Sequence, residues 1–288
     1  MMYSLQTDHG KRIPLHDEAA FAAMRRVGRV AADTLDMIAP HVKPGISTAE
    51  LDALCEAYMR QVGSIPATIG YNGYQHASCI SVNHVVTHGI PSHTKYLREG
   101  DIVNIDVTPL LDGWHGDTSR TFQVGAVSIL AERLVKKTYE AMFAGINAVR
   151  PGATLGDVGA AIEAVVRAHG FSSVRDFCGH GIGQIFHDAP QVLHYGRAGA
   201  GVVLEPGMIF TIEPMLNAGG HHVKVLRDEW TTVTKDHSLS AQFEHTVAVT
   251  DVGVEIFTLS AAERTRLTPA SGAQVRASLN AMPEHRTA

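Results

Sequence analysis

The sequence predicts an α/β fold in which two related halves face each other. Residues 97–106 read L-R-E-G-D-I-V-N-I-D and recur at residues 204–213 as L-E-P-G-M-I-F-T-I-E, each position shifted by 107. The same shift carries residues 42–47 (V-K-P-G-I-S) onto residues 149–154 (V-R-P-G-A-T) without a gap. An internal repeat of this kind indicates two copies of one structural unit. In both copies, amphipathic helical patterns alternate with short β-branched runs, which is typical of a sheet covered by helices.

The first copy opens with two helical patterns. Apolar side chains recur every three or four positions over residues 17–39, which predicts an amphipathic helix. A second helix is predicted directly after Ser47, because Ser47 and Glu50 form a capping box in which each side chain binds a free amide at the helix start. Gly63 ends this second helix. The apolar residues that carry its helical spacing are Leu51, Leu54, Tyr58 and Val62.

The stretch from residue 101 to residue 125 contains two carboxylates that are candidates for a functional site. The β-branched run at residues 102–107 predicts a buried strand, yet Asp106 lies inside it, and a turn-rich segment then leads to Asp117. A carboxylate is seldom buried without a partner. Glu213 is the equivalent of Asp106 in the second copy. We therefore expect a carboxylate from each half to meet at a pseudo-twofold axis.

The second copy repeats the order of helices and strands. A helix is predicted to begin at Thr154, and a long amphipathic helix is predicted over residues 128–149. A last strand, residues 241–250, brings in Glu244. The residues expected to face inward from the long helix are Leu130, Leu134, Val135, Met142 and Ile146.

A glycine-rich segment, residues 177–190, carries two histidines of the second copy. His180 and His187 are seven residues apart and do not fit one helical face, and the glycines between them allow a close backbone approach. His187-Asp-Ala-Pro matches His88-Gly-Ile-Pro in the first copy. We therefore expect His187 to act as a counterpart of His88 rather than to bind metal.

Composition and charge exclude several classes of protein. The chain has 288 residues, of which 45% are hydrophobic, and its formal net charge is -5, with no lysine and arginine run that would bind nucleic acid or a membrane surface. No apolar stretch could span a membrane, and residues 1–16 lack the apolar part of a secretion signal. The three cysteines, Cys55, Cys79 and Cys178, suggest neither a disulfide framework nor a thiolate zinc site. We expect a cytoplasmic enzyme.

The candidate site gathers four carboxylates and one imidazole: Asp106, Asp117, His180, Glu213 and Glu244. Ionised carboxylates a few ångströms apart repel, and each loses hydration on burial, so such a group requires cations. Oxygen-rich ligation with a single nitrogen suits two divalent ions, Mn(II), Fe(II) or Co(II), with Zn(II) as an alternative. Two such ions that share a water would lower its pKa and polarise a carbonyl group, which is the machinery of amide hydrolysis.

The motifs around these residues resemble one family. The strings N-I-D-V-T, H-G-D-T-S-R, C-G-H-G-I-G, F-T-I-E-P-M and S-A-Q-F-E-H-T, in this order, are similar to those of the type I methionine aminopeptidases, which have the pita-bread fold. The resemblance runs from Glu18 to Thr250. It implies a bacterial-style, minimal enzyme that removes the initiator methionine from nascent proteins and peptides, preferring a small second residue.

The resemblance also implies a role for each residue of the candidate site. Asp106 would chelate one metal ion, and Asp117 and Glu244 would bridge both ions. His180 and Glu213 would complete the ligands of the other ion. Glu213 would also serve as the general base for the attacking water.

Substrate contacts are implied in the same way. His88 and His187 would hold the scissile amide and stabilise the oxyanion. Thr68 and Asn72 depart from some bacterial members, which have cysteine and histidine there; this affects inhibitor preference at the pocket edge rather than the reaction. The residues matched to the methionine pocket are Tyr71, Tyr74, Cys79, Phe186 and Trp230. Those matched to a monovalent-cation site are Asn83, Val85 and Ser240.

We expect a single catalytic pita-bread domain over residues 1–267, with halves at about 17–125 and 126–253. Residues 268–288, rich in Ala, Ser, Arg and Pro, are expected to form a disordered tail. A monomer is expected, and the resemblance leaves association with the ribosome open.

Two alternatives share the fold. Xaa-Pro aminopeptidases and dipeptidases use the same five ligands, but they normally carry a large additional N-terminal domain, for which the residues before the first helix leave no room. A non-catalytic binding module on this fold would be expected to lack metal ligands, whereas all five are present. Metal content and methionine release distinguish these classes.

Overall fold

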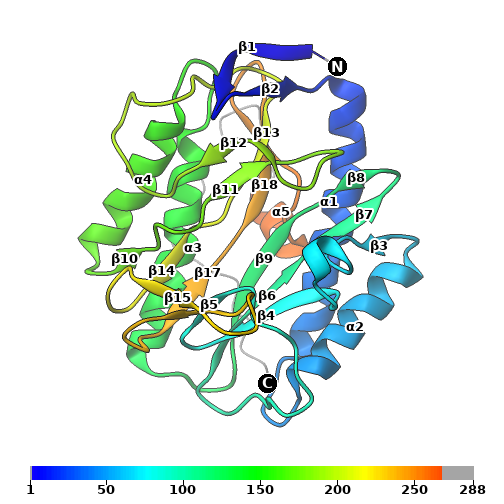
Figure 1. Ribbon diagram of the computed structural model, residues 1–288, viewed down its shortest axis with the longest axis vertical. Coiled ribbons are helices and arrows are strands. Elements are labelled where there is room, and N and C mark those ends of the chain that lie inside the picture. The colour runs from blue at the N-terminus through cyan, green and yellow to red at the C-terminus, as the bar shows by residue number, and fades with distance from the viewer. Residues whose placement is uncertain (1, 268–288) are drawn as a thin grey trace.

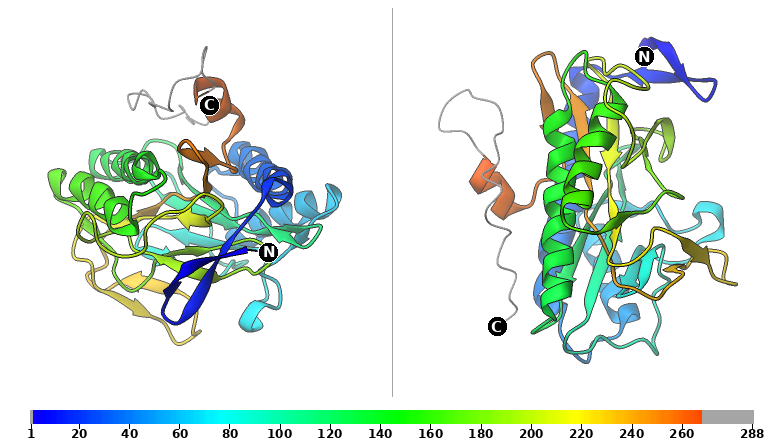
Figure 2. Two further views of the ribbon diagram at one scale, coloured as in Figure 1. Left: turned by 90° about the horizontal axis from the view of Figure 1, so that it is seen from above. Right: turned by 90° about the vertical axis from the view of Figure 1, so that its left-hand side faces the viewer.

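The computed structural model describes residues 2–267 and confirms the predicted α/β architecture (Figure 1). Helices α1 and α2 flank the strands on one side of the molecule, and α3 and α4 flank them on the other (Figure 1). Seen from above, these helices cover one face of the strands, and the opposite face is left to strands and loops (Figure 2). None of the helices in the described range is long and apolar enough to cross a membrane. The tail predicted at residues 268–288 lies outside that range.

The bounds of the helices follow the predicted patterns closely, whereas the strand predicted over residues 241–250 forms two shorter strands separated by Phe243 and Glu244. The helices are α1 (Glu18–Ile38), α2 (Thr48–Gln61), α3 (Ile129–Ala148), α4 (Leu155–Ala168) and α5 (Ala261–Leu267), with 3-10 turns at Ala39–His41 and Tyr71–Gly73. The strands are β1 (Met2–Asp8), β2 (Lys11–Leu15), β3 (Ile65–Pro66), β4 (Ser78–Val82), β5 (Val85–Thr87), β6 (Ile102–Val107), β7 (Pro109–Leu111), β8 (Trp114–His115), β9 (Thr118–Gln123), β10 (Ser172–Ser173), β11 (Gly179–Gly181), β12 (Asp188–Val192), β13 (Ile209–Ile212), β14 (Met215–Asn217), β15 (Val223–Val225), β16 (Thr232–Thr234), β17 (Ser240–Gln242), β18 (His245–Val249) and β19 (Val254–Ile256).

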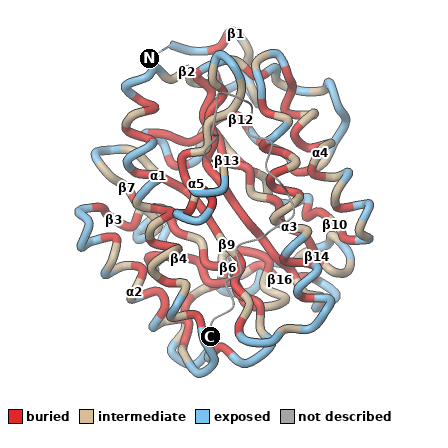
Figure 3. The backbone as a smooth tube through the Cα atoms, turned by 180° about the vertical axis from the view of Figure 1, so that it is seen from behind, coloured by how far each residue is buried: buried red, intermediate tan, exposed pale blue. Residues whose placement is uncertain are grey.

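Two antiparallel sheets position the candidate site. In the first half the strand order is β4-β6-β9, and in the second it is β12-β11-β13-β18-β19. Successive side chains of a strand point to opposite faces of its sheet. Val103, Ile105 and Val107 of β6 therefore pack into the core of the first half, while Asp106 lies on the other face. Buried backbone follows the central strands and the inner sides of the helices (Figure 3).

The internal repeat has a counterpart in matched local geometry. Helices α2 and α4 are related by the 107-residue shift at both ends, and Ser47 and Thr154 each begin their helix with a capping box. Ser47 forms an isolated bridge with Tyr96, and Thr154 forms the equivalent bridge with Val203. Turn glycines also occur in equivalent pairs with φ between +72° and +96°: Gly45 and Gly152, Gly63 and Gly170, and Gly100 and Gly207. The two copies therefore share a backbone design and not only a sequence pattern.

Side chains fasten the two halves together along β9, β17 and β18. The Thr118 hydroxyl donates to the carbonyl oxygen of Glu244 at 2.6 Å, and the Glu244 amide donates to the carbonyl oxygen of Ser119 at 3.0 Å. The Thr246 hydroxyl donates to the carbonyl oxygen of Asp117 at 2.7 Å. We refer to these contacts between Asp117–Ser119 and Glu244–Thr246 as the seam. Two carboxylate residues of the candidate site thus belong to the seam itself.

Two details of the helix packing differ from the sequence pattern. The buried face of α2 is formed by Leu51, Cys55 and Met59, whereas Val62 is 39% exposed. Two rows of side chains, one through Leu51 and Leu54 and one through Leu51 and Cys55, lie next to each other on the helix surface. Both rows have helical spacing, so the sequence alone does not show which one faces the core. Leu130 is 46% exposed, because Ala131 takes the inward position in the first turn of α3.

The sequence pattern did not predict an N-terminal β-hairpin. β1 pairs with β2 in an antiparallel ribbon, joined by His9 and Gly10, which have φ values of +47° and +78°. Two-residue turns with positive φ at both positions suit the twist of a hairpin, and glycine favours them. The His-Gly dipeptide between two short runs is the signal that could have revealed it.

Candidate metal centre

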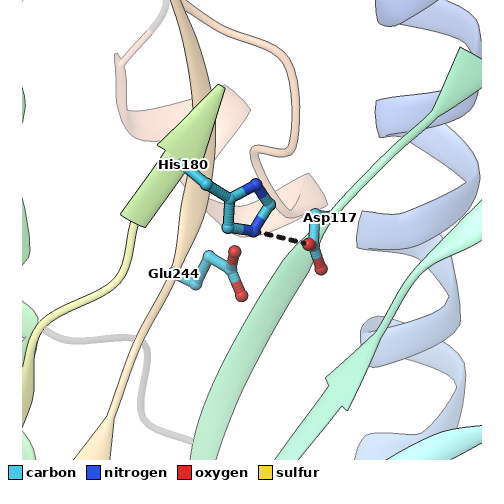
Figure 4. A group of neighbouring side chains, drawn as sticks. All are labelled: Asp117, His180 and Glu244. Atoms are coloured by element: carbon cyan, nitrogen blue, oxygen red, sulfur yellow. Dashed lines mark ion pairs between the residues drawn. The ribbon is translucent and has the colours of Figure 1, made fainter. Parts of the chain in front are cut away.

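The five candidate residues come from strands of both halves. Asp106 lies on β6, and Asp117 directly precedes β9. His180 lies on β11, Glu213 follows β13, and Glu244 separates β17 from β18. The side chains of Asp117, His180 and Glu244 converge (Figure 4), and each offers an atom within 4.8 Å of the other two. All five residues line one cleft of about 540 Å³.

His180 is oriented as a ligand would be. Its Nδ1 lies 3.0 Å from the carbonyl oxygen of Gly181. Because a carbonyl oxygen only accepts, Nδ1 carries the hydrogen, and the neutral ring presents the lone pair of Nε2. Nε2 lies 3.6 Å from Asp117 Oδ2 and 3.7 Å from Glu213 Oε1. Burial lowers the pKa of His180 to about 4, which keeps the lone pair available at neutral pH.

Each carboxylate of the cluster makes ionisation of the other carboxyl groups less favourable. Burial raises the pKa of Asp106 well above its ordinary value, and the charge of Asp117 raises it further. Burial, followed by the charge of Asp117, likewise raises the pKa of Glu213 and that of Glu244. The pKa of Asp117 is also raised by burial, although hydrogen bonds from the Thr108 hydroxyl and the Thr118 amide oppose the rise. Four ionised carboxylates this close together are unfavourable unless cations neutralise them. Carboxylate oxygens with one imidazole nitrogen are ligands that suit divalent metal ions.

Neighbouring polar groups hold the carboxylates in place. The Thr108 hydroxyl donates to Asp117 Oδ1 at 2.8 Å. Glu213 accepts from the Thr211 hydroxyl at 2.8 Å and from the Gln242 amide at 3.2 Å. Its backbone amide donates to Nε2 of His194 at 3.1 Å. Burial lowers the pKa of His194 to about 3, so this imidazole stays neutral and can accept.

Sequence reasoning missed His194 and Gln242 as supports of the cluster. Gln242 ends β17, and His194 lies in a bend just after β12, and nothing in the local pattern marks either residue as functional. A fully buried histidine, with no exposed surface, reveals its role only when its contact with Glu213 is visible.

The glycine-rich segment permits the close approach of β11 to its neighbours. A Cβ atom at Gly179 would overlap the carbonyl oxygen of Thr211, and one at Gly181 would overlap that of Ala189. His180 lies between these two glycines. The strand can therefore carry its imidazole toward the carboxylates only with glycine on both sides.

His88 and His187 lie beside the cluster. Both line the cleft, and the rings of His187 and His180 have centroids 4.2 Å apart. His187 Nδ1 lies 2.8 Å from the Tyr71 hydroxyl. His88 has a positive φ of +56°, a strained backbone that is common at functional sites. Burial lowers the pKa of His88 to about 4, and the pKa of His187 is lowered by burial and by its histidine neighbours.

Aromatic side chains form the apolar wall of the cleft. Tyr74 and Trp230 have ring centroids 4.9 Å apart, as do Tyr71 and Phe186. Cys79 is opposite Asp106 in the β4–β6 pairing, and burial raises the pKa of its thiol, which keeps it neutral. All five residues matched to a methionine pocket line this cleft, as do Thr68 and Asn72.

The residues matched to a monovalent-cation site are adjacent to one another but outside the cleft. The Ser240 amide donates to the carbonyl oxygen of Asn83 at 2.8 Å. Val85 begins β5, two residues after Asn83. The Ser240 hydroxyl is buried, and no hydrogen-bond partner is found for it among the residues that the structure describes. These positions could supply oxygen ligands.

Fold and site together define the class of the protein. The sequence model of metallopeptidase family M24 matches residues 22–251, and the chain belongs to this family. An X-Pro aminopeptidase from Thermotoga maritima shares the fold, with a TM-score of 0.67 at 19% identity, but the match covers 62% of its chain.

Closer relatives narrow the assignment. The chain is 53% identical to a methionine aminopeptidase of Rickettsia prowazekii over 86% of this chain and 96% of that protein. It is 54% identical to methionine aminopeptidase A of Synechocystis sp., over 87% and 99% of the two chains. The crystal structure of the Rickettsia prowazekii methionine aminopeptidase superposes with a TM-score of 0.85, covering 86% of this chain and 100% of that chain. Within family M24, this chain is therefore one of the methionine aminopeptidases.

Proposed function

We propose that the protein removes the N-terminal initiator methionine from nascent proteins and peptides, and that it prefers a small second residue. The observation that carries the proposal is the convergence of Asp117, His180 and Glu244 within 4.8 Å in a cleft that aromatic side chains also line. The names of the relatives, at 53% and 54% identity, support the same substrate.

We propose that two divalent metal ions, Fe(II), Mn(II) or Co(II) with Zn(II) as an alternative, bind here. Asp106 would hold one ion, Asp117 and Glu244 would be shared, and the other ion would be completed by His180 and Glu213. When bound, such ions activate a water and polarise the scissile carbonyl. The fit rests on the chemistry of the donor set, since buried carboxylates raise one another's pKa and a lone pair of His180 is directed at them.

Glu213 and the two histidines would carry the proton transfers and the charge stabilisation. Glu213 would accept a proton from the attacking water, because its carboxylate lies in the cluster, 3.7 Å from Nε2 of His180. With the Tyr71 hydroxyl as donor to His187 Nδ1, the neutral ring keeps an N–H at Nε2 for the developing oxyanion. His88, held neutral by burial, would orient the scissile amide from the other half.

The apolar wall would bind the methionine side chain. Tyr74, Cys79 and Trp230 line the cleft together with Tyr71 and Phe186. A thioether packs well against aromatic rings, with a gain of about 0.3–1.5 kcal/mol per contact. The neutral thiol of Cys79 adds no charge to this pocket.

Further features belong to the same proposal. Residues 1–267 would act as one catalytic domain with halves at about 17–125 and 126–253, in line with the equivalent turns and bridges of the two copies. Asn83, Val85 and Ser240 would bind a monovalent cation. We further propose a monomer that acts in the cytoplasm on nascent chains, with transient association with the ribosome.

Methionine release from short peptides tests the function. Protein purified without oxygen is expected to cleave Met-Ala-Ser faster than Met-Leu-Ser, to lose both activities on chelation, and to regain them with Mn(II), Fe(II) or Co(II). Ala-Pro-Ser serves as the control substrate for the alternative reaction. Preferential cleavage of Ala-Pro-Ser, or no methionine release with any metal, would overturn the proposal.

Chelation is also expected to lower the Tm more at pH 8 than at pH 5. The pKa values of Asp106, Glu213 and Glu244 are raised in the folded protein without metal, so ionisation is harder there than in the unfolded chain. This destabilisation is absent below the ordinary carboxyl pKa of about 4 and grows as the pH rises above it. Calorimetry of chelated and metal-loaded protein measures the difference, and an equal loss of Tm at both pH values would contradict it.

A further inference from the structure

The N-terminal hairpin forms part of the cleft that holds the candidate metal centre. Asp8, His9 and Lys11, at the turn between β1 and β2, line the same cleft as Asp117 and His187. The hairpin lies at the top of the molecule, next to β12 (Figure 1). The match to the family model begins at residue 22, after the hairpin ends. This wall of the cleft is therefore additional to the part of the chain that the family model covers.

Contacts with the second half hold the hairpin in this position. The Gln6 side chain donates to the carbonyl oxygen of Val203 at 2.9 Å and accepts from its amide at 2.8 Å, as a strand residue would. Ile13 is buried in the core of the second half. At the base, the His16 amide donates to the carbonyl oxygen of Gly207 at 2.8 Å. A segment fixed along its length in this way can contact a substrate without first having to fold.

Two opposite charges of the hairpin lie at the cleft. Asp8 Oδ2 accepts from the amide of Gln191, the residue four beyond His187, at 2.7 Å. Lys11 is exposed and is the single lysine or arginine among the described residues that line the cleft. The next residue, Arg12, is absent from the lining, and its guanidinium stacks 4.5 Å from the centroid of Tyr3. Alternation along β2 thus directs one cation to the cleft and its neighbour away from it.

We propose that the hairpin is a substrate-specificity element, in which Lys11 and Asp8 respond to the charge of the peptide beyond its second residue. The inference rests on the proposed function, because that function places the substrate's N-terminus at the metal centre. An extended peptide advances about 3.3 Å per residue, so the residues after the second one leave through the part of the cleft that the hairpin borders. Lys11 favours acidic side chains there, and Asp8 favours basic ones.

Charge-neutral variants of the two residues test this proposal. The substrates are Met-Ala-Ser-Gly-Gly peptides with either Asp or Lys at position three, four or five. Lys11→Met is expected to shift the ratio of kcat/KM toward the Lys peptide, and Asp8→Asn is expected to shift it toward the Asp peptide. Asn keeps an acceptor for the Gln191 amide. Each shift should be about two- to fivefold, the scale of one exposed charge pair, and should shrink at high salt.

Arg12→Met is the matched control, because it removes a cation from the same strand but from the face that stacks on Tyr3. It should leave the ratio unchanged. Equal ratios in every variant, or shifts of the same sign for Lys11→Met and Asp8→Asn, would overturn the inference while methionine release stands. Absence of methionine release from every peptide by the unmodified enzyme would instead refute the proposed function.

Discussion

Asp117→Asn is expected to lose nearly all turnover. Asparagine keeps the volume of the side chain and an acceptor for the Thr108 hydroxyl, which lies 2.8 Å from Asp117 Oδ1. It removes the charge that both metal ions would share. Loss of an outer hydrogen-bond partner typically costs about 10- to 100-fold in metal affinity or activity, and loss of a shared ligand should cost more. Metal titration and kcat on Met-Ala-Ser measure the two effects.

Stability separates loss of metal binding from loss of the fold in this variant. The charge of Asp117 raises the pKa of Asp106, Glu213 and Glu244, so a neutral residue there relieves repulsion in the chelated protein. Chelated Asp117→Asn should therefore unfold at the same Tm as the chelated unmodified protein, or higher. Thr108→Val, which removes only the supporting hydroxyl, should retain more activity. Unmodified metal affinity or turnover in Asp117→Asn would contradict the assignment.

The second large effect is expected for His187→Ala. If the imidazole donates to the oxyanion, its removal affects the transition state more than the bound substrate. The expected loss of kcat is about 10²- to 10³-fold, the usual scale for one oxyanion donor, with KM and bound metal nearly unchanged. Tyr71→Phe is the matched variant, because it removes the hydroxyl 2.8 Å from His187 Nδ1 and should lower kcat by a smaller factor.

A structural role for His187 predicts a different outcome. Its ring centroid lies 4.2 Å from that of His180, so a residue that only braces this segment would loosen His180 when removed. Metal content would then fall, and excess metal would restore activity. Kinetics together with metal analysis of the purified variant therefore decide between catalysis and support.

The sequence predicted those features that depend on local patterns and on the repeat. The capping boxes at Ser47 and Thr154 begin α2 and α4 as expected, because caps are decided within one turn of the chain. The sequence also singled out Asp106, because a carboxylate in an apolar strand is unfavourable alone, and the repeat paired it with Glu213.

Features that depend on contacts between distant segments could not be predicted in this way. The choice of Cys55 and Met59 for the core face of α2 depends on what packs against the helix, since neighbouring stripes have the same period. The contact of His194 with the Glu213 amide joins the segments that follow β12 and β13, and no local pattern encodes their proximity. The position of the hairpin at Met2–Leu15 depends on the second half, which holds it, although its His-Gly turn is a local signal.

The seam has a consequence for how a polypeptide reaches the metal centre. The backbone of Asp117 and that of Glu244 are both tied across it, through Thr246 and Thr118, so a hinge motion that parted the halves would pull the ligands apart. Binding is therefore expected to occur without closure of the two halves around the substrate. Nothing has to shut behind the bound end of the chain. Such an enzyme can work on a polypeptide whose other end is still tethered to a much larger particle.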